Sequence, residues 1–371
     1  MHLPYCKRRI MLLLITCFGM YSGTMAQTST VFQPDQIKAT MLKVAGWQMN
    51  HSNRKPLNDW TNGAFYTGVF AAFEATRSNT LLDSMMAMGE RKQWQPGRRF
   101  DHADDYAICQ TYIDLYRLSK DKKMIQPTLD SLQKMKEVEG NEVKKHGITW
   151  WWCDALFMAP PAMAKLAKTL QEPSYLVWSD TLFRQTYALL YNSEAHLFAR
   201  DASYLIDANG VGKKEANGEK IFWSRGNGWV LAGLARYLQE MPGKYAGRKF
   251  YIQLYKEMAE KIITLQQPDG LWRTSLLDPG SYVGGEGSGT GFYCYALAWG
   301  IQQKLLDKKT YMPVVKKAWE ALNTLVTEEG KVGWVQPIGA DPRRNFNAES
   351  WESYGAGAFL LAGSAMLQIL K

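Results

Sequence analysis

Residues 150–158 read Trp-Trp-Trp-Cys-Asp-Ala-Leu-Phe-Met and continue as an apolar segment to Leu170. Three indole rings exclude water from the carboxylate that follows them, and loss of water disfavours its charged form, so we expect a raised pKa for Asp154. A carboxylic acid that stays protonated near neutral pH can act as a general acid. The alternative is that Asp154 only caps the following helix while the tryptophans fill core.

Five other segments share this design, in which a cluster of polar, glycine and aromatic residues leads into an apolar helix. The six segments begin at Trp60, His102, Trp150, Trp223, Ser288 and Ser353. Their spacing fits a helical hairpin plus a connecting loop, as in arrays of helix pairs. Amphipathic helices lie between them, for example at residues 251–265 and 313–326, with apolar residues at intervals of three and four.

The leading helices are rich in Ala and Gly, which permits close packing in an inner ring, whereas the intervening helices carry Lys and Glu as an outer ring would. We therefore predict an all-α fold, an (α/α)6 barrel of six hairpins closed into a toroid. A closed ring needs no polar capping repeat, unlike an open solenoid, which is the alternative. Closure would gather the N-terminal ends of the inner helices at one mouth, together with Asp104, Asp105, Asp154, Arg225, Trp229 and Thr290.

The first residues have the pattern of a secretory signal. Residues 7–9 are basic, residues 10–18 form an apolar run too short to span a bilayer, and residues 24–26 fit a cleavage site. We expect residues 1–26 to be a signal peptide, residues 27–371 to form a single catalytic domain, and the protein to be exported to the periplasm. Lipidation at Cys17 is a weaker alternative, because Thr16 fits a lipoprotein box poorly. No later segment has the length and hydropathy of a membrane span.

Composition excludes several classes of function. Three of the five cysteines lie beyond the signal, and without a CxxC pair they indicate neither a disulfide framework nor a zinc site. The histidines form no HExxH motif and no GxSxG elbow is present, so we expect no metal and no cofactor. The formal charge of +9 is dispersed and no nucleic-acid motif occurs, which fits an acidic small-molecule substrate rather than nucleic acid. The glycine-rich residues 284–291 lack a P-loop lysine and are expected to line a pocket.

Two further motifs carry polar chemistry. In the segment from His102, two adjacent acids cannot face the same way, so one would cap a helix and the other enter the cavity; we favour Asp104 for the cavity over Asp105. Residues 223–229 read Trp-Ser-Arg-Gly-Asn-Gly-Trp, and two glycines in an opening turn cost helix stability unless backbone passes close to something. Arg225 offers a planar fork for a carboxylate, and Trp229 a flat apolar face for a sugar ring.

Together these motifs resemble glycoside hydrolase family 105, the unsaturated rhamnogalacturonyl hydrolases, and more distantly the unsaturated glucuronyl hydrolases of family 88. Residues 102–105, 152–158 and 223–229 match in the family's order. The resemblance implies an (α/α)6 barrel, with Asp154 as general acid and base and an acid of the 104–105 pair in support. It also implies that Trp152, Arg225 and Trp229 lie at the sugar.

The chain departs from the better-known members at two places. Where those members carry a histidine after a Leu-aromatic pair, residues 197–201 of this chain read Leu-Phe-Ala-Arg-Asp, so that Arg200 stands near that position. Only His146 is a rough, shifted counterpart of a second histidine. We expect Asp105, Arg200, His146 and Thr290 to contribute to substrate binding.

The implied reaction removes a 4,5-unsaturated uronic acid from the non-reducing end of a lyase-generated oligosaccharide. Protonated Asp154 would deliver a proton to C4, water would add at C5, and the hemiketal would open and release the aglycone. Asp104 would hold sugar hydroxyls and, as a nearby anion, help to keep Asp154 protonated. The alternatives are a conventional inverting glycosidase acting on an acidic polysaccharide, with Asp104 as base, and a non-catalytic carbohydrate-binding protein.

Overall fold

The computed structural model describes residues 1–2, 30–138, 146–342 and 345–370, so nearly all of the expected signal peptide lies outside the described residues. Twelve α-helices occupy the described residues: α1 (Pro34–Asn50), α2 (Trp60–Thr76), α3 (Asn79–Arg91), α4 (Cys109–Ser119), α5 (Gln126–Val138), α6 (Ala155–Leu170), α7 (Ser174–Leu190), α8 (Ser224–Glu240), α9 (Arg248–Ile263), α10 (Gly287–Gln302), α11 (Lys308–Thr324) and α12 (Ser353–Ile369). Short 3-10 helices lie at η1 (Thr30–Phe32), η2 (Ala103–Tyr106), η3 (Lys122–Met124), η4 (Ala202–Tyr204) and η5 (Pro279–Ser281). Strands β1 (Tyr191–Asn192) and β2 (Leu197–Phe198) pair antiparallel.

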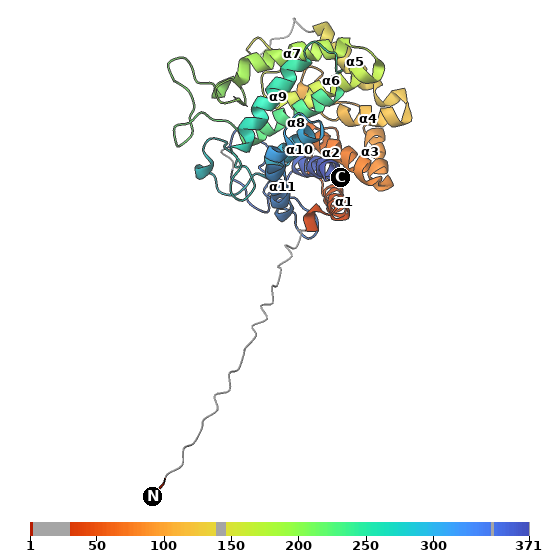
Figure 1. Ribbon diagram of the computed structural model, residues 1–371. Coiled ribbons are helices and arrows are strands. Elements are labelled where there is room, and N and C mark those ends of the chain that lie inside the picture. The colour runs from red at the N-terminus through yellow and green to blue at the C-terminus, as the bar shows by residue number, and fades with distance from the viewer. Residues whose placement is uncertain (3–29, 139–145, 343–344, 371) are drawn as a thin grey trace.

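The even-numbered helices form a closed inner ring. Each packs against the next even-numbered helix in sequence, and α12 packs against α2, which places the C-terminal helix beside the second helix of the chain (Figure 1). Because this last contact closes the ring, the open-solenoid alternative is wrong and the predicted (α/α)6 barrel is confirmed.

The seam between α2 and α12 depends on two glycines. A Cβ added to Gly68 would lie 2.4 Å from the carbonyl oxygen of Gly357, and one added to Gly357 would lie 2.4 Å from the carbonyl oxygen of Ala64. Real Cβ atoms do not approach this closely, so the two helix backbones can touch only because both residues lack a side chain. The ring thus closes at backbone contact, as the small residues of the leading helices suggested.

The outer helices are amphipathic and cover the ring. On α11, for example, the buried residues recur at intervals of three and four: Tyr311, Val315, Ala318, Trp319 and Leu322. This face packs on α10 and α12, while α7 packs on α6 and α9 on α8. Within the described ranges, no helix has both the length and the hydropathy that crossing a bilayer requires.

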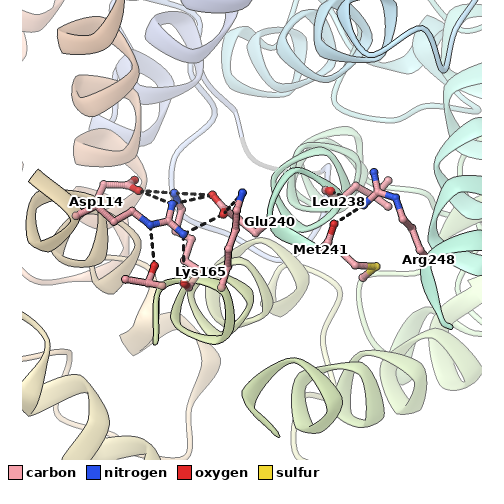
Figure 2. A network of polar contacts seen from close by, with 9 residues as sticks. Asp114, Lys165, Leu238, Glu240, Met241 and Arg248 are labelled. Atoms are coloured by element: carbon pink, nitrogen blue, oxygen red, sulfur yellow. Dashed lines mark hydrogen bonds and ion pairs between the residues drawn. The ribbon is translucent and has the colours of Figure 1, made fainter. Parts of the chain in front are cut away.

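The far end of the ring is lined by charged side chains near the C-terminal ends of α4, α6 and α8 (Figure 2). Lys165 lies 2.6 Å from Asp114 and 3.4 Å from Glu240, and Arg117 donates to both carboxylate oxygens of Glu240 at 3.0 and 2.9 Å. Burial opposes ionisation of Glu240, but Lys165 and Arg117 outweigh it and hold the pKa of this carboxyl at about 2. Paired opposite charges therefore surround a cavity of about 90 Å³ at this end of the barrel.

Candidate active site

The N-terminal ends of the inner helices surround a cavity of about 150 Å³. Its walls combine aromatic faces, two carboxylates and one guanidinium. The lining residues are Trp60, Asp104, Trp152, Asp154, Met158, Arg200, Trp223, Trp229, Ile338 and Gly339. The segments that supply them are far apart in sequence, so the cavity exists only in the closed ring.

Asp154 precedes α6 but does not cap it, because its side chain accepts no hydrogen bond from the first turn. The residue is 9% exposed, next to buried Trp152 and Cys153. Burial raises the pKa of Asp154, while the charges of Arg200 and Arg225 oppose the rise. The carboxyl group is thus a desolvated acid facing a cavity, and the capping alternative does not hold.

Asp104 lies on η2 and lines the same cavity. Trp152 donates its indole N–H to Oδ1 of Asp104 at 3.2 Å, and Nδ1 of His102 lies 3.6 Å from Oδ2. Burial and the charge of Asp154 raise the pKa of Asp104 to about 7. Burial and the charge of Arg99 lower the pKa of His102 to about 4, so His102 is neutral at pH 7. Asp104 therefore exchanges its proton near neutral pH, beside a second carboxyl group, Asp154, whose pKa is also raised.

Asp105 faces away from the cavity. Its carboxylate accepts hydrogen bonds from the backbone N–H of Arg99 and from the Arg99 guanidinium, both at 2.6 Å. Asp105 therefore fixes the loop before η2, which corrects the expectation that it binds substrate. The adjacent acid, Asp104, holds the cavity position.

Arg225 differs from the expectation of a free fork for a substrate carboxylate. It is 1% exposed and does not line the cavity. Its guanidinium donates to the main-chain carbonyl of Gln336 and, at 3.0 Å, to that of Pro337. Trp223 and Tyr354 lie 4.5 and 4.8 Å from its charged carbon. Arg225 thus anchors residues 336–339, a loop that supplies Ile338 and Gly339 to the cavity wall.

The aromatic wall includes one residue that the motifs did not single out. Trp229 lines the cavity as expected, with Phe292 against its ring at a centroid distance of 4.2 Å. Trp60 lies edge-on to Trp229 at 6.1 Å and stacks on Tyr354 at 5.5 Å. Trp60 begins the first of the six leading segments, as Trp223 begins the fourth, and this shared position is the sequence feature that indicates a place at the cavity.

Arg200 lines the cavity, whereas His146 and Thr290 do not. His146 is exposed in the turn before residue 150. Thr290 is fully buried, and its hydroxyl accepts the backbone N–H of Trp272 at 3.1 Å. Thr290 therefore holds the 267–276 loop against α10, and the expectation that these two residues line the sugar site is not met.

Comparison with known proteins agrees with this geometry. The sequence model of Glycosyl Hydrolase Family 88 matches residues 38–370. An unsaturated 3S-rhamnoglycuronyl hydrolase of Formosa agariphila is 43% identical over 348 residues, covering 90% of this chain and 91% of the relative. A protein of the same name from an Alteromonas species is 36% identical, covering 83% and 77%.

Solved structures share this fold. A family 88 glycosyl hydrolase from Bacteroides vulgatus superposes with a TM-score of 0.81 at 31% identity, covering 91% of this chain and 99% of that one. A structure described as a polysaccharide lyase has the same TM-score at 33% identity, covering 91% and 98%. A possible family 105 member from Salmonella enterica, 19% identical with a TM-score of 0.72, shares the fold. With its family model matched along nearly the whole chain and two acids facing one aromatic cavity, this protein belongs to glycosyl hydrolase family 88.

Proposed function

We propose that this protein removes a 4,5-unsaturated uronic acid from the non-reducing end of oligosaccharides in which that sugar is linked to rhamnose. The names of the Formosa and Alteromonas relatives support the rhamnose linkage. A small cavity with aromatic walls and one cation suits a single acidic sugar ring.

The observation that carries the proposal is the pair of carboxyl groups in one water-poor cavity. Burial raises the pKa of both Asp154 and Asp104, so a protonated carboxyl group is available near neutral pH. The C4=C5 bond of the substrate is a vinyl ether through the ring oxygen. Such a bond is activated by a proton at C4, and a buried acid can supply that proton.

The chemistry then follows in three steps. Protonated Asp154 transfers its proton to C4, and positive charge develops at C5 and the ring oxygen. A water molecule adds to C5 and gives a proton to the Asp154 carboxylate, which restores the acid. The hemiketal at C5 opens, the hemiacetal left at C1 releases the aglycone alcohol, and an open-chain keto-aldehyde remains. Asp104 holds sugar hydroxyls through its second oxygen while Trp152 fixes the first.

The test is to follow the ultraviolet absorbance of the conjugated double bond with an unsaturated uronyl-rhamnose disaccharide. The expected result is loss of absorbance together with release of rhamnose. A gain of absorbance from a saturated polyuronate would instead indicate a lyase, and release of a saturated sugar would indicate a conventional glycosidase. Binding without any turnover would leave a carbohydrate-binding protein.

A further inference from the structure

Arg200 is the only cationic side chain among the described residues that line the cavity. It is 20% exposed and lies over the ring of Trp151, with 5.7 Å between its charged carbon and the ring centroid. One terminal nitrogen donates to Asp201 at 2.7 Å. Its Nε is buried and has no hydrogen-bond acceptor among the described residues, although Oδ2 of Asp154 lies 3.4 Å away. This arginine therefore has an unused donor beside the acid.

Arg225, the rival cation, donates its two terminal nitrogens to the carbonyls of Gln336 and Pro337. Its Nε also has no acceptor among the described residues, but Arg225 is 1% exposed and does not line the cavity. A substrate carboxylate could reach it only by displacing the loop that forms the cavity wall. Arg200 needs no such rearrangement, because only a long contact to Asp154 must be exchanged.

We propose that Arg200 binds the carboxylate of the uronic acid in exchange for Asp154, and that this exchange makes Asp154 take up the proton which it then delivers to C4. In the free protein, Arg200 lies between the carboxylates of Asp154 and Asp201. In the complex, the substrate carboxylate replaces Asp154 at the guanidinium. Asp154 is then a buried carboxylate without its closest cation, and it binds one proton from solvent, so charge is balanced. This inference rests on the proposed function.

The other charged groups around Asp154 do not replace Arg200. The charge of Asp201 favours protonation of Asp154, and Asp104, with a pKa of about 7, is only partly ionised near neutral pH. Buried Cys153 stays a thiol because burial raises its pKa. His102 is neutral, and Arg225 is held by its contacts to the carbonyls of Gln336 and Pro337. Binding of the acidic sugar thus favours the protonated form of Asp154 over its ionised form, and an uncharged analogue would not have this effect.

The first experiment needs only the wild-type protein. The pH dependence of kcat/KM reports the pKa values of the essential groups in the free enzyme, and the pH dependence of kcat reports them in the enzyme–substrate complex. With the acidic disaccharide, we expect the pKa of Asp154 to be about one unit higher in the complex than in the free enzyme, which is a tenfold change in proton affinity. The alkaline limb of kcat should then lie about one pH unit above that of kcat/KM. With the methyl ester of the same disaccharide, the two limbs should coincide. Coinciding limbs for the acid, or an equal separation for the ester, would overturn the proposal.

The second experiment uses Arg200→Gln, with Arg200→Lys as the conservative variant. Loss of the guanidinium should lower kcat/KM for the acid about ten- to hundredfold and leave the ester within about threefold. It should also move the free-enzyme alkaline limb to higher pH, because the charge that opposes protonation of Asp154 is gone. Arg200→Lys should recover part of the preference for the acid over the ester.

Arg184→Gln is the matched control, since this arginine pairs with Asp180 on the outer helix α7. It should match wild type on both substrates. If Arg200→Gln does not fold, the wild-type pH profiles and Arg200→Lys still decide the question. An equal loss on acid and ester, with unmoved pH limbs, would make Arg200 merely structural and contradict the inference. Failure of the wild type to consume the unsaturated disaccharide would contradict the proposed function instead, so the two failures are distinguishable.

Discussion

The guanidinium of Arg225 donates a hydrogen bond to the main-chain carbonyl oxygen of Gln336, across more than a hundred residues of sequence. The same loop is held by Tyr354, whose hydroxyl donates to that carbonyl at 2.6 Å, and by Trp223, whose indole donates to the Gln336 side chain at 2.8 Å. One wall of the cavity therefore depends on a buried polar cluster behind it.

Replacing Arg225 by Ala should thus displace the 336–339 loop that forms the cavity wall, without a specific effect on binding of the substrate carboxylate. We expect lower stability, by about 1–3 kcal/mol, because the carbonyl of Pro337 loses this donor and that of Gln336 keeps only Tyr354. We also expect a similar loss of kcat/KM on the acidic disaccharide and on its methyl ester. Thermal unfolding and paired kinetics measure both effects. A loss confined to the acidic substrate would assign its carboxylate to Arg225.

Asp154→Asn should fold and bind substrate but lose several orders of magnitude in kcat, because an amide cannot deliver a proton. The comparison is Asp201→Asn, which removes the other carboxylate at Arg200 but no proton donor. Its kcat should fall far less. Retention of more than about a tenth of the wild-type kcat in Asp154→Asn would leave Asp104 as the acid.

Asp104→Asn should shift the pH dependence as well as the rate. The charge of Asp154 raises the pKa of Asp104, and since repulsion between like charges acts on both groups, removing the Asp104 carboxylate is expected to lower the proton affinity of Asp154. The alkaline limb of kcat/KM is therefore expected to move to lower pH, opposite to the shift expected for Arg200→Gln. An unmoved limb would mean that the two carboxyl groups titrate independently.

The ionic cluster at the far end should support stability in a pH-dependent way. Glu240 has a pKa of about 2 in the folded protein against an ordinary value near 4.5, so its stabilisation is complete above the ordinary value and disappears as the pH falls through about 2. Glu240→Gln should cost about 3–5 kcal/mol at pH 7, because buried cations lose a partner.

Unfolding free energies of Glu240→Gln and wild type should therefore converge between about pH 5 and pH 2. The exposed Glu194, paired with Lys220, provides the control variant Glu194→Gln, whose effect should be small at every pH. A constant difference for Glu240→Gln across this range would show that its charge is not what stabilises the barrel.

Closure of the ring can be tested at its glycine seam. Gly357→Ala places a methyl group against the carbonyl oxygen of Ala64 and should cost about 1–3 kcal/mol. Gly46→Ala on α1 meets no atom within 4 Å and should be neutral or stabilising by up to about 1 kcal/mol. Denaturant unfolding of the two variants checks the contrast, and equal effects would contradict backbone contact at the seam.

The sequence predicted what depends on local pattern. Apolar periodicity and small residues identified the inner ring, and the tryptophans before Asp154 predicted its raised pKa. The choice of Asp104 over Asp105 followed from the geometry of adjacent side chains. For Arg225 and Thr290 the sequence predicted substrate contact, whereas both residues bind loops of the protein. Their partners, Gln336 and Trp272, lie on distant loops that carry no motif. A side chain at a helix start can face the cavity or the loop beside it, and only the tertiary contacts decide which.

The most direct test of the account is the position of solvent hydrogen in the first product. The reaction is run in heavy water on the unsaturated disaccharide and followed by NMR at early times. Hydration by Asp154 predicts deuterium on one face of C4 only, formed together with free rhamnose and absent in Asp154→Asn. A first product that keeps its C4=C5 double bond and carries no deuterium at C4 would show direct cleavage at the anomeric carbon and contradict the account.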